Sequence, residues 1–115
     1  MEFNKLERAI LDWYKSHYQN DTLNTQIDSA IPINRKWTEV GFYIDLQVDT
    51  SLAAVPPMNG FEDGRAIMGP HIESSQIEDG GGVLLFVKDG HLEFIEMYSF
   101  GARFEEHISD FKLNG

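Results

Sequence analysis

The dipeptide Asp89-Gly90 constrains the fold of this chain more than any other feature, because it separates two runs of apolar, β-prone residues. Asp-Gly suits a two-residue type I′ turn, in which both central residues need a positive φ angle. The sequence therefore predicts a long antiparallel β-hairpin over residues 82–100. Away from the turn the two strands are apolar on both faces, which is typical of strands in the middle of a sheet. We expect helices on one face, and a long loop or a partner chain on the other.

Glu96 is the polar exception in this hairpin. If the two-residue turn sets the register without interruption, Glu96 lies opposite Val83, in an apolar stripe with Leu85 and Phe94. A buried carboxylate needs a hydrogen-bond donor or takes a raised pKa, so Glu96 and Tyr98 are candidate polar anchors of a ligand pocket. Two alternatives give Glu96 a structural role: a hydrogen bond to backbone or to an arginine, or a β-bulge that turns it outward.

The composition is that of one folded domain. The 115 residues are 42% hydrophobic and 12% aromatic, which is enough for a true core. The absence of cysteine excludes disulfides and thiolate sites. The first residues lack the basic and apolar regions of a secretory signal, and no apolar run reaches the roughly 18 residues of a membrane span. We therefore expect a cytoplasmic protein without a membrane partner.

The formal net charge is −10, and it is unevenly distributed. Residues 1–40 hold six acidic and five basic side chains, whereas residues 41–115 hold thirteen and four. Nucleic acids and anionic membranes bind clusters of Lys and Arg, so we expect neither as a partner. An acidic surface would instead steer a basic protein toward it, although acidity also keeps a protein soluble without any partner.

Two amphipathic helices are predicted near the N-terminus. Asn4-Lys5-Leu6-Glu7 resembles a capping box, and apolar residues at helical spacing continue to about Tyr18. Asp21 or Thr22 would cap a second, shorter helix. That helix would end before Pro32, because the residue preceding a proline is disfavoured in the α region.

The middle of the chain predicts a strand, a long loop and a segment of uncertain pairing. Residues 37–48 alternate between apolar and polar, as in a half-buried strand with one wet face. Residues 49–64 form a loop long enough to have a functional role. Residues 65–77 are apolar but contain Gly69-Pro70, so they form an edge strand or lie outside the sheet. After the hairpin, spaced apolar residues predict a short closing strand or a docked tail.

The chain carries no strong motif for catalysis, a cofactor or a metal. Gly80–Gly82 precedes a strand rather than a helix and lacks the lysine of a phosphate-binding loop. Two histidines each lie two residues from a glutamate, in His71/Glu73 and His91/Glu93, and such pairs bind a metal only with distant carboxylates. We therefore expect no cofactor and no metal, and we favour a protein that is not an enzyme.

Three stretches of the chain together resemble a widespread group of small, uncharacterised bacterial α+β proteins. These proteins have a GxGF strand, an LFVxDGxLxxLE hairpin and a YSYG-like end, and the likeness lies mainly in residues 37–48 and 81–101. Ile95 stands where the pattern has Leu, Phe100 stands where it tends to have Tyr, and the Trp-Pro that often follows is absent. The resemblance implies no firm activity. By analogy, such small acidic proteins resemble the immunity partners encoded beside bacterial toxins.

We thus expect an α+β fold with two N-terminal helices packed on a four- or five-stranded antiparallel sheet. The leading hypothesis is a non-enzymatic, immunity-like domain whose acidic surface binds a basic protein. Its binding residues would come from the wet sheet face and the long loop: Tyr43, Asp45, Met58, Phe61, Glu62 and Asp63. The alternative is a ligand-binding or enzymatic pocket under the 49–64 loop, anchored by Glu96 and Tyr98. A homodimer that closes the sheet face is a third hypothesis.

Overall fold

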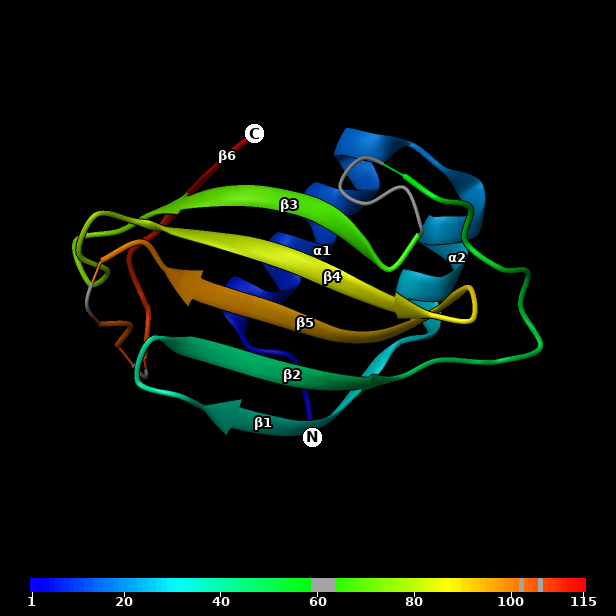
Figure 1. Ribbon diagram of the computed structural model, residues 1–115, viewed down its shortest axis with the longest axis horizontal. Coiled ribbons are helices and arrows are strands. Elements are labelled where there is room, and N and C mark those ends of the chain that lie inside the picture. Colours follow the sequence, from blue (N-terminus) through cyan, green and yellow to red (C-terminus); the bar gives the residue numbers. More distant parts are fainter. Residues whose placement is uncertain (59–63, 102, 106) are drawn as a thin grey trace.

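The structure is a computed structural model, in which we describe residues 1–58, 64–101, 103–105 and 107–115 (Figure 1). Within these residues the chain is α+β, with two helices followed by an antiparallel sheet of six strands. The elements are α1 Lys5–Tyr18, α2 Asp21–Ser29, β1 Ile31–Trp37, β2 Gly41–Gln47, β3 Ala66–Glu73, β4 Gly81–Lys88, β5 His91–Ser99 and β6 Lys112–Asn114. The expectation of four or five strands was therefore too low.

The two helices begin at asparagine caps. In α1 the side chain of Asn4 accepts a hydrogen bond from the Glu7 amide, and the Glu7 carboxylate accepts one from the Asn4 amide, each at 2.9 Å. This reciprocal pair satisfies two amides that the first helical turn cannot pair. The cap of α2 is Asn20, whose side chain accepts from the Leu23 amide at 2.9 Å. The expected caps, Asp21 and Thr22, are instead the first residues of the helix.

The strand order in the sheet is β1-β2-β5-β4-β3-β6, so β5 and β4 take the two middle positions. They are joined by Asp89 and Gly90, which have φ angles of +52° and +81°. Figure 1 shows both helices behind the sheet, on one of its faces. Among the described residues no helix lies on the other face, which we call the open face.

A β-bulge interrupts the pairing of β4 with β5. Val87 faces Leu92, but the next pair is Phe86 with Phe94, so Glu93 is an extra residue on β5. Because side chains alternate along a strand, one extra residue moves every later side chain of β5 to the opposite face. The uninterrupted register was therefore wrong beyond Glu93. The alternative in which a bulge turns Glu96 outward is correct.

The core lies between the helices and the other face of the sheet. Its fully buried side chains from the helices and the four central strands include Ile10, Tyr14, Leu23, Ile44, Ile67, Leu85 and Ile95. The buried amide of Gln26 in α2 adds polar contacts to this core. Its Nε2 donates to the carbonyls of Ala53 and Gly90, and its Oε1 accepts from the Leu92 amide. Gln26 thus attaches the helix layer to both the 49–58 segment and the turn of the hairpin.

The segment of uncertain pairing forms β3 inside the sheet. β3 pairs with β4 along its length, with a register shift at Gly69-Pro70, and its residues His71–Glu73 also pair with β6. β6 is the short closing strand of the chain. Neither α1 nor α2 is long and apolar enough to cross a membrane, and these are the helices of the described residues.

Candidate functional site

The open face of the sheet has an apolar centre. Strand pairing and alternation place on it one row of side chains from four neighbouring strands, Tyr43, Glu96, Leu84 and Met68, in the order β2, β5, β4, β3. The adjacent row is Asp45, Phe94, Phe86 and Ala66. Most of these large side chains are partly buried, and Met68 is 41% exposed.

Aromatic rings join the two rows. Phe86 and Phe94 stack with centroids 4.4 Å apart and planes 15° apart. Tyr43 lies 5.7 Å from Phe94, in a tilted arrangement. Phe100, which follows β5 and is 54% exposed, lies 5.7 Å from Tyr98. These contacts fix the rings against the sheet, so the open face presents a preformed apolar surface.

Carboxylates lie on one half of this face. Glu96 accepts a hydrogen bond from the hydroxyl of Tyr43, and this bond to an anion raises the pKa of Tyr43. Asp45 accepts a hydrogen bond from Nδ2 of Asn34 at 3.3 Å. We call the part of the open face on β2 and β5, with Asp45 and Glu96, the acidic half. The part on β4 and β3, with Leu84 and Met68, is the apolar half.

Tyr98 lies on the same face as Glu96 but has a packing role. Tyr98 pairs with Gly82 of β4 on one side and with Gly41 of β2 on the other. A Cβ atom added at Gly82 would lie 2.5 Å from the hydroxyl oxygen of Tyr98, so this side chain covers the glycine. An aromatic ring over a cross-strand glycine shields backbone that has no side chain of its own. The role of Tyr98 as a polar anchor stays a prediction.

The open face thus brings together four of the residues that the sequence singles out: Tyr43, Asp45, Glu96 and Tyr98. Met58 does not join them, because it is partly buried against the core. Phe61, Glu62 and Asp63 lie outside the described residues. The aromatic neighbour Phe94 was missed, because the uninterrupted register placed it on the helix-covered face.

The described part of the 49–64 loop does not lie over Glu96. The amide of Val55 donates to the carbonyl of Gly90, and the carbonyl of Leu52 lies 2.9 Å from Nε2 of His91. These contacts hold residues 52–55 at the turn of the hairpin, whereas Glu96 faces Tyr43 further along β5. Residues 52–55 thus do not cover Glu96, and the pocket under the 49–64 loop with Glu96 as its anchor stays a prediction.

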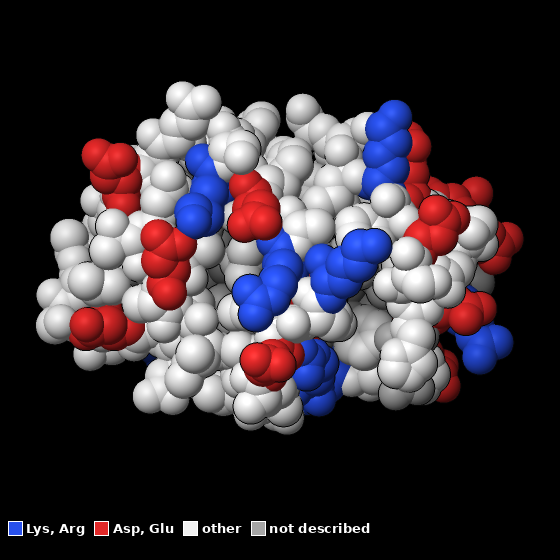
Figure 2. Space-filling model, turned by 180° about the vertical axis from the view of Figure 1, so that it is seen from behind, with Lys and Arg blue, Asp and Glu red and all other residues white. Residues whose placement is uncertain are grey.

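The helix side of the molecule differs from the open face in its charge. Figure 2 views this side and shows Lys and Arg side chains across its middle, with most Asp and Glu side chains toward its two ends. α1 and β1 supply basic residues here, among them Arg8, Lys15 and Arg35. Arg8, Lys15 and Arg35 are therefore separated from the open face by the thickness of the sheet, whereas Lys36, which pairs with Tyr43, lies on the open face.

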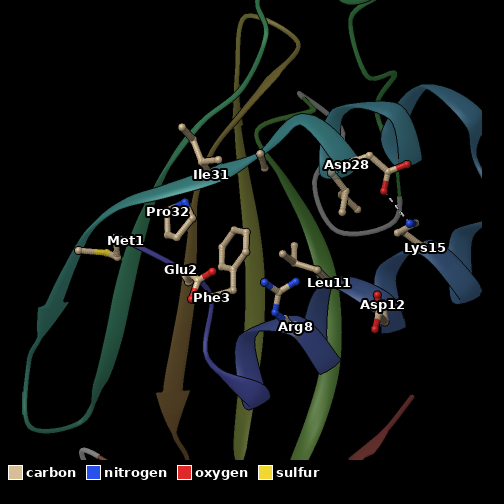
Figure 3. Close-up of a pocket in the computed structure, with 12 residues that line it drawn as sticks. Met1, Glu2, Phe3, Arg8, Leu11, Asp12, Lys15, Asp28, Ile31 and Pro32 are labelled. Atoms are coloured by element: carbon tan, nitrogen blue, oxygen red, sulfur yellow. Dashed lines mark hydrogen bonds and ion pairs between the residues drawn. The ribbon is translucent and has the colours of Figure 1, made fainter.

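A hollow of about 380 Å³ lies on the helix side, between the N-terminal segment, α1 and the start of β1. Figure 3 shows Phe3, Arg8 and Leu11 around it. The ion pair of Lys15 with Asp28, 2.6 Å long, lies beside it. Charged groups of both signs surround the hollow, so its electrostatics favour no class of ligand.

Neither a metal centre nor a known relative identifies the site. The described residues contain no group of three or more His, Asp or Glu side chains placed to hold a metal ion. Comparisons of the chain with models of protein families, with curated proteins and with solved structures gave no match. We choose the open face as the candidate functional site because of its side chains, which form an apolar half and an acidic half.

Proposed function

We propose that this protein is a non-enzymatic binding domain whose open face docks a basic protein. The observation that carries the proposal is the pairing of an apolar half with an acidic half on a sheet face that no helix of the described residues covers. A sheet face normally buries its apolar side chains against another layer. A contiguous apolar patch on a surface is typical of an interaction site.

The side chains of the open face are of the kinds that protein interfaces use. Tyrosine, phenylalanine and methionine are enriched in the cores of interfaces, and the open face offers Tyr43, Phe86, Phe94 and Met68. Rings that already stack on one another lose little conformational entropy when a partner binds. This favours docking on a rigid platform over docking on a loop.

Charge favours a basic partner over a second copy of the chain. At a net charge of −10 two copies repel one another, whereas a basic protein is attracted. Lysine or arginine side chains of the partner would pair with Asp45 and Glu96, and apolar side chains would pack on Leu84 and Phe86. The resemblance to small bacterial proteins extends the proposal to an immunity-like role, in which the basic partner is a toxin.

The test is capture of partners from a native lysate at low salt by the tagged protein and by two double variants. Asp45→Asn with Glu96→Gln removes both carboxylates of the acidic half. Asp12→Asn with Glu78→Gln makes the same chemical change at two exposed positions away from that face. We expect the wild type and the Asp12→Asn/Glu78→Gln variant to capture a basic protein that moderate salt releases. The Asp45→Asn/Glu96→Gln variant should not capture it.

Two outcomes would overturn the proposal. In one, both double variants capture the same partner equally well, so that only the overall charge matters. In the other, folded wild-type protein captures nothing that salt releases. A Phe86→Ala variant adds an independent measure, because loss of the apolar anchor should weaken capture at low salt without changing any charge.

A further inference from the structure

A second hollow, of about 390 Å³, lies on the helix side near the N-terminal end of α1, and we call it the Trp37 hollow. It is lined by the first turn of α1, the ends of β1 and β2 that meet at their connecting loop, and the segment after β5. Its volume is within the range of sites that hold small organic molecules. It lies on the opposite side of the sheet from the open face, so it is a separate site.

Three aromatic side chains form its apolar walls. Phe42 and Phe104 meet edge to face, with ring centroids 5.6 Å apart and planes 80° apart. The indole Nε1 of Trp37 donates a hydrogen bond to the carbonyl of Phe104 at 3.3 Å, and Trp37 is still 44% exposed. Phe104 itself is fully buried. The walls are therefore fixed, and part of the indole remains accessible.

Polar residues also line the hollow, and the guanidinium of Arg35 lies among Glu2, Asn4, Glu7 and His107. Its Nε donates to Oε2 of Glu7 at 2.7 Å, and its Nη2 donates to Oε1 of Glu7 at 2.6 Å and to the carbonyl of Glu2. Its Nη1 donates to no atom of the described residues. Glu7 is 1% exposed, whereas Arg35 is 28% exposed. The side chain of Arg35 is thus partly accessible, and its Nη1 is the donor nitrogen that the pair with Glu7 does not use.

We infer that the Trp37 hollow binds an uncharged aromatic molecule that carries a carbonyl acceptor. The ring contacts Trp37 and Phe42 by edge or offset stacking, with Phe104 buried behind them. The carbonyl oxygen accepts from Nη1 of Arg35. An uncharged molecule is favoured over an anion, because Glu7 already neutralises Arg35 and the protein carries a net charge of −10. It is favoured over a cation, because both carboxylate oxygens of Glu7 already accept hydrogen bonds.

The test uses benzamide as the probe and the indole N–H signals of the wild-type protein in proton–nitrogen NMR spectra. A Trp13→Phe variant assigns the two signals. We expect benzamide to shift the Trp37 signal with a dissociation constant on the order of 1 mM and to leave the Trp13 signal in place. Benzene, which lacks the acceptor, should bind about fivefold more weakly. Equal binding of the two probes would overturn the assignment of Arg35.

Two variants locate the site. Phe42→Leu removes one aromatic wall and should weaken benzamide binding about fivefold. Phe111→Leu makes the same change at a partly buried position that does not line the hollow and should leave benzamide binding unchanged. Arg35→Lys keeps a cation beside Glu7 but removes Nη1, so benzamide should lose its advantage over benzene. A Trp37 signal that does not move at the solubility limit of benzamide would overturn the inference without any variant.

Discussion

Gln26 holds Leu92 by a buried hydrogen bond, in which Oε1 of the side chain accepts from the backbone amide at 3.0 Å. The same side chain donates through Nε2 to the carbonyls of Gly90 and Ala53, at 2.9 and 2.8 Å. One fully buried residue of α2 therefore satisfies three backbone groups from two other segments. Buried backbone groups without partners are costly, so this side chain links the layers of the fold energetically.

Replacing Gln26 with Leu should destabilise the protein by about 3 kcal/mol, because the Leu92 amide and the Ala53 carbonyl lose their hydrogen bonds to Gln26 and the Gly90 carbonyl loses one of its two. Gln47→Leu is the matched control, since Gln47 is exposed at the end of β2, and it should change stability by less than about 0.5 kcal/mol. Urea denaturation followed by circular dichroism measures both values. Similar stabilities for the two variants would show that the Gln26 amide is not needed.

Gly41→Ala should be far more damaging than Gly82→Ala. A Cβ at Gly41 would meet the backbone carbonyl oxygen of Met97 at 1.9 Å, and backbone in the middle of a sheet cannot move aside. A Cβ at Gly82 would meet the ring of Tyr98, whose side chain can rotate away. We expect losses of more than about 3 kcal/mol and of about 1 kcal/mol, respectively. Equal losses in thermal and urea unfolding would contradict this packing.

Glu96→Gln should lower the pKa of Tyr43 toward its ordinary value. In the wild type the hydrogen bond to the Glu96 carboxylate, and then its negative charge, raise this pKa. The phenol carbon signal of Tyr43, followed by NMR from pH 8 to 12, measures the change. Asp45→Asn serves as the control. The pKa of Tyr43 should stay higher in this variant than in Glu96→Gln. The same result in both variants would contradict the pairing of these side chains on the open face.

Stability should fall above about pH 10 through Tyr14. Burial, then the charge of nearby Tyr18, raise the pKa of Tyr14 well above its ordinary value. The unfolded chain, with a phenol pKa of about 10, then loses its proton at a lower pH than the folded protein. The stability that the neutral phenol contributes is therefore complete below pH 10 and is lost as the pH rises toward the folded-state pKa.

Tyr14→Phe tests this pH dependence. The variant loses the hydrogen bond from the hydroxyl to the carbonyl of Ile67, which should cost about 1 kcal/mol near neutral pH. It should then lose less stability than the wild type between pH 8 and pH 11. Urea unfolding at both pH values gives the comparison, and parallel losses in wild type and Tyr14→Phe would refute the assignment.

The class of the fold and the first helix could be predicted from the sequence, because local chemistry determines them. Asn4 and Glu7 form the capping box that their spacing indicates. The cap of α2 was placed one or two residues late, since Asn20 and Asp21 are both good capping residues and only the backbone geometry distinguishes them. β1 was missed because Pro32 indicates the end of a helix and because a register shift after Pro32 breaks its alternation.

The candidate site was predicted only in part, because a register shift that the sequence does not reveal moves some of its residues to the other face. Tyr43 and Asp45 follow a regular alternation and were placed on the correct face. Phe94 and Glu96 lie beyond the bulge at Glu93, and the apolar pattern does not reveal an extra residue there, because Leu92 and Phe94 are both apolar. The pairing of strands that are distant in the sequence, which depends on packing, decides this register.

The bulge at Glu93 also limits how a lineage carrying this fold could change it. Point substitutions at the outward positions of β5 can remodel the partner-facing surface while the buried positions stay untouched. The loss or gain of a single codon at Glu93 would exchange the two sets, sending Glu96 toward the helices and Ile95 toward solvent. Related sequences should therefore differ in this hairpin by substitutions and keep its length constant. An insertion or deletion should require a second insertion or deletion in the same strand.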